Sequence, residues 1–273
     1  MNIEDFNDII YEKEENGICT ITLNTPRRKN ALSLVTFLEI ETVLDDMEQD
    51  KNARVLIITG CKEANAFSSG DYTKMDYLTS LPPEIKEQID VSDLTNKRLS
   101  LKFWDFSKPV IAAINGLAIG SAITMCQIGA DLIYMADNAW IGYYFIKNAV
   151  LPIFGGHFIL PFLLGFQKAK EIAYFGDKIT AHQAEKLGLV NKVLPPEELI
   201  PFAKEQALRL IPPKGPSLSI KLMKKTMHSY YKEILEKTLD LEIESNAAAI
   251  RTSDWRAVVK ASMTKTQPKF KGR

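Results

Sequence analysis

The segment from Lys108 to Cys126 constrains the fold most, because it has the pattern of a buried strand followed closely by a helix. Five apolar residues, Val110–Ile114, lie between Pro109 and an Asn-Gly turn, which is typical of a buried strand. Small residues from Gly120 then open a helix. Unpaired N–H groups at a helix start stabilise an oxygen that gains negative charge. A second small-residue turn, Phe67–Asp71, could supply another N–H to the same oxygen.

Strands and helices alternate through the first 200 residues, which predicts an α/β fold with parallel strands joined by crossovers. Beyond residue 200 only helices are expected. The sequence therefore predicts a core over 1–200 and a helical region over 201–273. The expected strands are 18–23, 55–59, 110–114, 132–135 and 189–194, and the expected helices are 31–47, 78–103, 121–129, 156–165, 181–187, 197–210, 215–226, 230–251 and 253–264.

Charge and cysteine content exclude several classes of partner. The 34 basic side chains balance the 34 acidic ones, so no net field attracts nucleic acid or an anionic membrane. Residues 149–166 carry no charge, but prolines and glycines interrupt them, which favours a buried pocket-lining helix over a membrane span. The three cysteines lack metal or redox spacing. We expect a cytoplasmic protein that binds no metal, nucleic acid or membrane.

Six segments together resemble the crotonase, or enoyl-CoA hydratase/isomerase, superfamily. Each is weak alone, but they occur in the family's order and spacing over nearly the whole chain. They are LNTPRRKNAL at 23–32, AFSSGD at 66–71, KPVIAAINGLAIG at 108–120, ADLIY at 130–134, GDKITAHQAEKLGLV at 176–190 and PKFKGR at 268–273.

The resemblance implies a spiral of repeated strand-strand-helix (ββα) turns, with C-terminal helices that build a homotrimer or a hexamer. It implies an acyl-CoA thioester as substrate, with coenzyme A carried by the substrate and no separate cofactor. By position, the thioester carbonyl would lie between the backbone N–H groups of Asp71 and Ser121. Stabilising a thioester enolate there agrees with the chemistry of the two small-residue turns.

The resemblance also implies a coenzyme A site. Arg27 and Lys29 match the loop that meets the CoA phosphates, and Lys265 matches a basic position that can reach CoA on a neighbouring subunit. From the residues alone, the basic loop would be an ordinary solvated turn, but the family context favours phosphate contact. Backbone groups near the nucleotide and pantetheine would come from Ala31, Ala66 and Ser68.

Two positions depart from the family pattern. The glutamates that hydratases use as acid and base are replaced by Thr124 and Phe145, neither of which can act as a carboxylate. We therefore expect isomerisation, C–C cleavage or decarboxylation rather than hydration. The alternative is an acyl-CoA-binding or scaffolding protein that has lost catalysis.

Several other side chains could move a proton. We place His157 and Tyr143 among the catalytic candidates, because imidazole titrates near neutral pH and a phenol can donate to a carbonyl. A core histidine would be the structural alternative for His157. The Asp71 carboxylate would oppose a developing oxyanion, and solvent-facing roles compete for the remaining candidates, which are Lys74, Tyr144 and Lys147.

Overall fold

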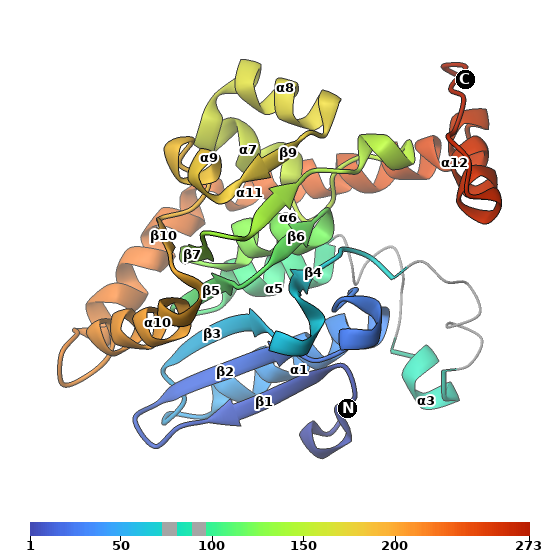
Figure 1. Cartoon of the computed structure of the whole chain (residues 1–273). Coiled ribbons are helices and arrows are strands. Elements are labelled where there is room, and N and C mark those ends of the chain that lie inside the picture. The colour runs from blue at the N-terminus through green and yellow to red at the C-terminus, as the bar shows by residue number, and fades with distance from the viewer. Residues whose placement is uncertain (73–80, 89–96) are drawn as a thin grey trace.

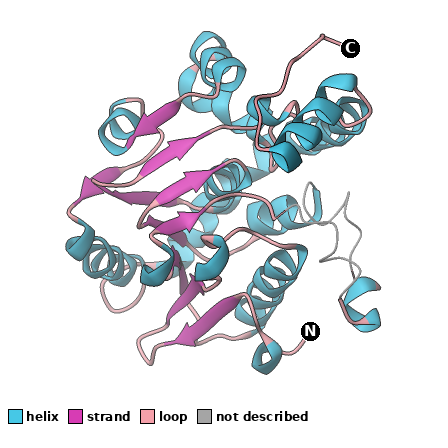
Figure 2. Ribbon diagram, turned by 45° about the vertical axis from the view of Figure 1, so that its right-hand side comes forward, coloured by secondary structure: helices cyan, strands magenta, loops and turns pink. Residues whose placement is uncertain are grey.

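The computed structural model describes residues 1–72, 81–88 and 97–273. Its strands form two sheets (Figures 1 and 2). The larger sheet has the order β1-β2-β3-β5-β7-β10, and every neighbouring pair is parallel except β1 with β2. Its strands are β1 (Ile9–Lys13), β2 (Ile18–Leu23), β3 (Val55–Gly60), β5 (Val110–Ile114), β7 (Leu132–Ala136) and β10 (Lys192–Leu194).

The smaller sheet has the order β4-β6-β8-β9, and its first three strands run parallel. Each of β3, β5 and β7 in the large sheet is followed along the chain by a three-residue strand of the small sheet, so the predicted strand-strand-helix spiral is confirmed. The strands are β4 (Ala66–Ser68), β6 (Leu117–Ile119), β8 (Trp140–Gly142) and β9 (Lys178–Thr180).

The first helices begin and end for local reasons. Helix α1 (Leu34–Gln49) starts later than predicted because Ser33 caps it: Ser33 Oγ accepts from the amide of Thr36, and the Thr36 hydroxyl accepts from the amide of Ser33. Helix α6 (Ser121–Gly129) has the predicted bounds. The prediction of a helix over 78–103 lies partly outside the described residues, which include α3 (Pro83–Lys86) and α5 (Leu99–Asp105).

The sequence predicted a buried pocket-lining helix in residues 149–166. That prediction is corrected, because helix α7 (Gly156–Leu164) is buried on one side only. Phe158 and Leu160 join the core, whereas Phe162 is 53% exposed. The predicted strand over 189–194 is also shorter, since only Lys192–Leu194 pairs with β7. The next helices are α8 (Phe166–Phe175), α9 (Ala181–Lys186) and α10 (Pro196–Leu210), the last of which contacts β2, β3, β5 and β7.

The C-terminal region differs most from expectation. The two helices predicted over 215–226 and 230–251 form one continuous helix, α11 (Ser217–Ala249), because no glycine or proline interrupts residues 227–229. Helix α12 (Ser253–Thr264) has the predicted bounds and lies at the far end of α11, away from the sheets (Figure 1). Leu235 and Leu239 anchor α11 in the core.

Candidate functional site

The carboxyl ends of three parallel strands meet at one edge of the small sheet. Ser68 of β4 pairs with Ala118 of β6, and Ile119 pairs with Gly142 of β8. The residues that follow these strands are therefore neighbours. Gly70 makes this approach possible: its φ is +90°, and a Cβ there would lie 2.8 Å from the Ile119 carbonyl oxygen.

The turns after β4 and β6 present the amides of Asp71 and Ser121. Asp71 bridges to Leu32, whose amide donates to the Gly70 carbonyl over 2.8 Å and whose carbonyl accepts from the Tyr72 amide over 2.8 Å. Ser121 is the first residue of α6, so its N–H has no partner within the helix. Among the described residues, no backbone carbonyl accepts from either amide.

The side chains of the same two residues also lie together. The residue Asp71 remains open to solvent, but the surrounding protein desolvates its carboxyl and raises its pKa to about 6. The Ser121 hydroxyl opposes this shift by favouring the charged form. Ser121 Oγ is buried and makes no hydrogen bond of normal geometry with the described residues, so the Asp71 carboxyl is the polar group that it acts on.

The basic loop of the sequence lies against this turn. The Ser69 amide donates to the Lys29 carbonyl over 3.0 Å, and its hydroxyl donates to the Arg28 carbonyl over 3.2 Å. Arg27 and Lys29 are exposed, and neither forms an ion pair with the described residues. Arg28 has a structural role, since it binds Asp8 over 2.5 Å.

The remaining predicted CoA contacts divide between two regions. Ala31, Ala66 and Ser68 are buried beside the turn, where Asn30 donates to the Ala66 carbonyl over 3.1 Å and Ser68 Oγ accepts from the Gly70 amide over 3.2 Å. Lys265 is exposed at the end of α12, apart from the sheets.

Tyr143 follows β8 and is fully buried. Burial raises the pKa of its hydroxyl, so the phenol keeps its proton and can donate a hydrogen bond, but it is a poor acid. Gln127 of α6, which the sequence analysis did not single out, opposes this rise in pKa, although neither group makes a hydrogen bond of normal geometry with the described residues. Tyr144 lies partly exposed beneath Lys147, whose Nζ is 3.9 Å from the ring centre.

Thr124 and Phe145 flank the start of α6. Thr124 is fully buried, and its hydroxyl lies 3.4 and 3.5 Å from the carbonyls of Ser121 and Gly120. The Phe145 ring lies beside Gly120, 3.8 Å from where a Cβ would be. The Phe145 ring therefore gives the residue before Ser121 an apolar neighbour. Lys74, another sequence candidate, lies outside the described residues.

His157 stands at the start of α7 and contacts Glu242 of α11. The His157 Nδ1 and the Glu242 Oε1 are 2.8 Å apart, and the carboxylate is buried. Sequence analysis missed Glu242, because it lies 85 positions from His157 and no sequence motif joins the two residues. The structure brings Asp71, Ser121 and Tyr143 to one edge of the small sheet. His157 instead bonds to Glu242 of helix α11.

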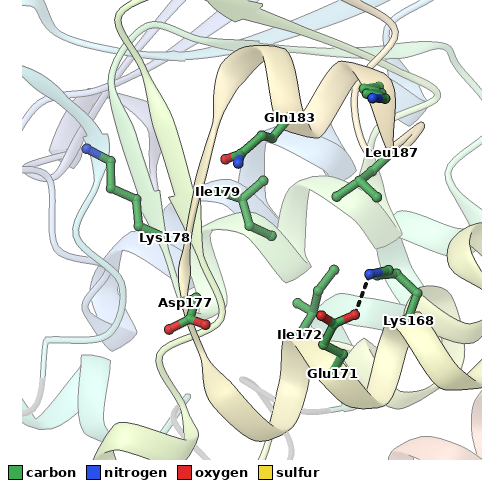
Figure 3. A pocket seen from close by; sticks show the side chains of 9 residues that line it. Lys168, Glu171, Ile172, Asp177, Lys178, Ile179, Gln183 and Leu187 are labelled. Atoms are coloured by element: carbon green, nitrogen blue, oxygen red, sulfur yellow. Dashed lines mark hydrogen bonds and ion pairs between the residues drawn. The ribbon is translucent and has the colours of Figure 1, made fainter.

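A separate groove of about 290 Å³ lies between α8, β9 and α9 (Figure 3). Its lining is mostly charged side chains around Ile172, Ile179 and Leu187, and Lys168 binds Glu171 across one turn. It contains none of the predicted site residues, so the candidate site remains at the edge of the small sheet.

Among the helices that the structure describes, none combines the length and the hydropathy of a membrane-spanning segment. No group of three or more histidine, cysteine, aspartate or glutamate side chains in the described residues is arranged to hold a metal ion.

Comparison with known proteins gives the family. The family model described as Enoyl-CoA hydratase/isomerase matches residues 13–273. The chain belongs to the enoyl-CoA hydratase/isomerase family. It is 32% identical over 267 residues to a crotonyl-CoA hydratase of Syntrophomonas wolfei, covering 97% of this chain and 98% of that protein. It is 29% identical to a 1,2-epoxyphenylacetyl-CoA isomerase of Escherichia coli, covering 97% and 99%.

Solved structures agree with this assignment of fold. An enoyl-CoA hydratase from Mycobacterium avium subsp. paratuberculosis superposes with a TM-score of 0.83 at 21% identity, covering 97% of this chain and 99% of that one. An enoyl-CoA hydratase from Bacillus anthracis gives 0.72 at 28% identity, covering 98% and 100%. The spiral core and C-terminal helices of the enoyl-CoA hydratase/isomerase family are thus both present in this chain.

Proposed function

We propose that this family member binds an acyl-CoA thioester and stabilises its enolate between the amides of Asp71 and Ser121. The observation that carries the proposal is the pair of N–H groups without backbone acceptors, at the adjoining ends of two parallel strands. Both N–H groups would donate a hydrogen bond to the carbonyl oxygen, which gains negative charge in the enolate. Removing one such donor costs about 10²- to 10³-fold in rate in enzymes that depend on it.

The proposed reaction is isomerisation, C–C cleavage or decarboxylation rather than hydration. The resemblance places Thr124 and Phe145 where hydratases carry glutamates, and neither side chain can activate water as a carboxylate. When a carboxylate on the carbon beside the thioester carbonyl leaves as CO2, the electron pair of the broken C–C bond remains and forms the same enolate. That step then needs a proton donor, for which His157 is the proposed group, while the Tyr143 phenol, whose pKa is raised by burial, is proposed as a hydrogen-bond donor that keeps its proton.

Coenzyme A would lie along the basic loop. Arg27 and Lys29 are exposed cations on a loop bonded to the Asp71 turn, which places positive charge beside the proposed thioester site. Phosphate groups prefer such partners. The backbone of Ala31, Ala66 and Ser68 would line the pantetheine path.

The protein is proposed to assemble as a trimer or a hexamer. Met223, Met227, Tyr230, Ile234 and Leu241 are exposed on α11 at helical spacing. An apolar stripe of this kind marks a contact surface in a soluble protein. Assembly through it would also bring Lys265 of one chain toward its neighbour.

The first test mixes purified protein with crotonyl-CoA and follows the conjugated thioester absorbance, with calorimetric titration of acetyl-CoA alongside. Acetyl-CoA binding without hydration is expected, followed by turnover of at least one 3-enoyl-, 3-ketoacyl- or malonyl-type CoA ester. Rapid hydration would contradict the proposed reaction class. Binding with no turnover across the panel would favour the second candidate, an acyl-CoA-binding protein without catalysis, which the loss of both glutamates supports.

A further inference from the structure

The buried carboxylate of Glu242 closes the start of helix α7. Its Oε2 accepts from the Gly155 amide over 3.0 Å, and its Oε1 accepts from the His157 amide over 2.9 Å. The same Oε1 lies 2.8 Å from His157 Nδ1. The residue is only 2% exposed, so these three groups replace the water that a carboxylate would otherwise bind.

This arrangement selects one form of the imidazole. An ionised carboxylate can only accept hydrogen bonds, so the proton of neutral His157 must be on Nδ1. The other nitrogen, Nε2, then carries the free electron pair. It makes no hydrogen bond with the described residues, and the side chain is 40% exposed. Glu242 therefore fixes His157 with a basic nitrogen directed away from α11.

The same loop reaches the start of α6. A Cβ on Gly156 would lie 3.2 Å from Thr124 Cγ2, and Thr124 is one helical turn beyond Ser121. The loop that presents His157 therefore packs against the residue that the resemblance places at a glutamate position. Ile128 and Leu235 hold the preceding Gly155, whose φ is +66°.

We propose that Glu242 is a positioning residue that holds His157 as the acid and base of this site, which places part of the catalytic apparatus on the C-terminal helix. His157 Nε2 takes a proton from the carbon beside the thioester carbonyl, and the electron pair moves to the carbonyl oxygen. The imidazolium that forms is paired with the Glu242 carboxylate. Nε2 later returns the proton to carbon. This inference rests on the proposed enolate chemistry.

The test combines a spectroscopic readout with kinetics on the complete protein. The chain has three histidines, so ¹⁵N labelling of histidine gives few signals, and His157→Gln assigns one of them. Wild-type His157 is expected as the Nδ1–H tautomer, with both tautomers populated in Glu242→Gln. Glu242→Asp keeps the charge and serves as a second variant if Glu242→Gln does not fold. His182→Gln, on exposed α9, is the matched control.

Kinetics on the best ester from the CoA panel complete the test. His157→Gln should lower kcat by about 100-fold or more, with KM within about twofold. Glu242→Gln should also lower kcat. The double variant, His157→Gln with Glu242→Gln, should be no slower than His157→Gln alone. An Nε2–H tautomer in the wild type, or an unchanged tautomer in Glu242→Gln, overturns the role of Glu242. Full kcat in His157→Gln overturns the catalytic role of His157, while absence of turnover in the wild type overturns the proposed function itself.

Discussion

The amide of Ser69 donates to the carbonyl of Lys29 over 3.0 Å, which fixes the basic loop to the turn that presents Asp71. Four further bonds join the same segments, including Asn30 to the Ala66 carbonyl and Leu32 to the Gly70 carbonyl. The proposed phosphate contacts and the proposed carbonyl contacts are therefore held by one rigid unit. A ligand that spans both would meet cations and amide donors at a fixed separation.

Replacing Arg27 or Lys29 with alanine should weaken coenzyme A binding without unfolding the protein. Each exposed cation should contribute about threefold to tenfold in Kd, and the loss should shrink as salt screens the charges. Titration of CoA at two ionic strengths measures this. Lys51→Ala, an exposed lysine elsewhere, is the control. Equal CoA affinity in Arg27→Ala, Lys29→Ala and the control would contradict a phosphate site here.

The pKa of about 6 at Asp71 predicts a pH dependence of ligand binding. Above pH 6 the carboxylate is charged and opposes the negative end of a carbonyl held at its own amide. As pH falls through 6 the carboxyl becomes neutral, so the preference for acetyl-CoA over free CoA should increase. Asp71→Asn removes the charge and keeps the shape, and it should make that preference constant between pH 5 and 8. A persistent pH dependence in Asp71→Asn would assign the effect to another group.

Much of the large sheet and of the helices could be predicted from sequence because hydrophobic periodicity reports burial directly. Strand β5 and helices α6 and α12 have their predicted bounds. The small sheet could not be predicted in the same way, since strands of three residues are too short to show alternation. The break expected near His228 was wrong because the contact that holds this turn of α11, the stacking of His228 on Trp104 of α5, joins residues distant in sequence.

The site divides similarly. The resemblance pointed to Asp71 and Ser121, which follow adjoining strands in the structure, and the local pattern predicted the helix that begins at Ser121. Glu242 was not found because its partners, Gly155 and His157, are distant in sequence and meet it only when α11 packs on α7. Gln127 was missed because a lone glutamine in an apolar helix carries no motif.

Glu39 should make folding stability depend on pH. Its buried carboxylate accepts from the amides of Asn7, Asp8 and Ile9 over 2.6 to 3.0 Å, yet burial and the Asp8 charge raise its pKa to about 7. The folded state therefore binds a proton that the unfolded state releases between about pH 4.5 and 7. The contribution of Glu39 to the free energy of unfolding should be full below pH 4.5 and fall as pH rises through 7.

Urea denaturation of wild type and Glu39→Gln at pH 5 and pH 8 tests this. The glutamine cannot ionise, so its variant should lose less stability between the two pH values than the wild type. Glu63→Gln, at an exposed position that forms no ion pair with the described residues, controls for loss of one negative charge. Identical pH dependence in Glu39→Gln and wild type would show that Glu39 does not bind the proton.

The apolar stripe on α11 should hold subunits together. Tyr230 is 78% exposed and Met227 is 65% exposed in the single chain. Tyr230→Glu combined with Met227→Glu would place charges in the proposed interface, where desolvation is costly. Light scattering after size exclusion should show a trimer or hexamer for the wild type and smaller species for the double variant. Lys225→Ala is the control on the same helix, and a monomeric wild type would rule out this assembly.

The central claim is that the Ser121 amide binds the thioester carbonyl. Proline at the first position of a helix removes an N–H that has no intrahelical partner, so Ser121→Pro deletes the donor while α6 can still form. Ser121→Ala removes only the hydroxyl. We would record the ¹³C carbonyl resonance of labelled acetyl-CoA bound to the three proteins. A downfield shift in wild type and Ser121→Ala that is lost in Ser121→Pro is predicted. The same shift in Ser121→Pro, with acetyl-CoA still bound, would contradict the account.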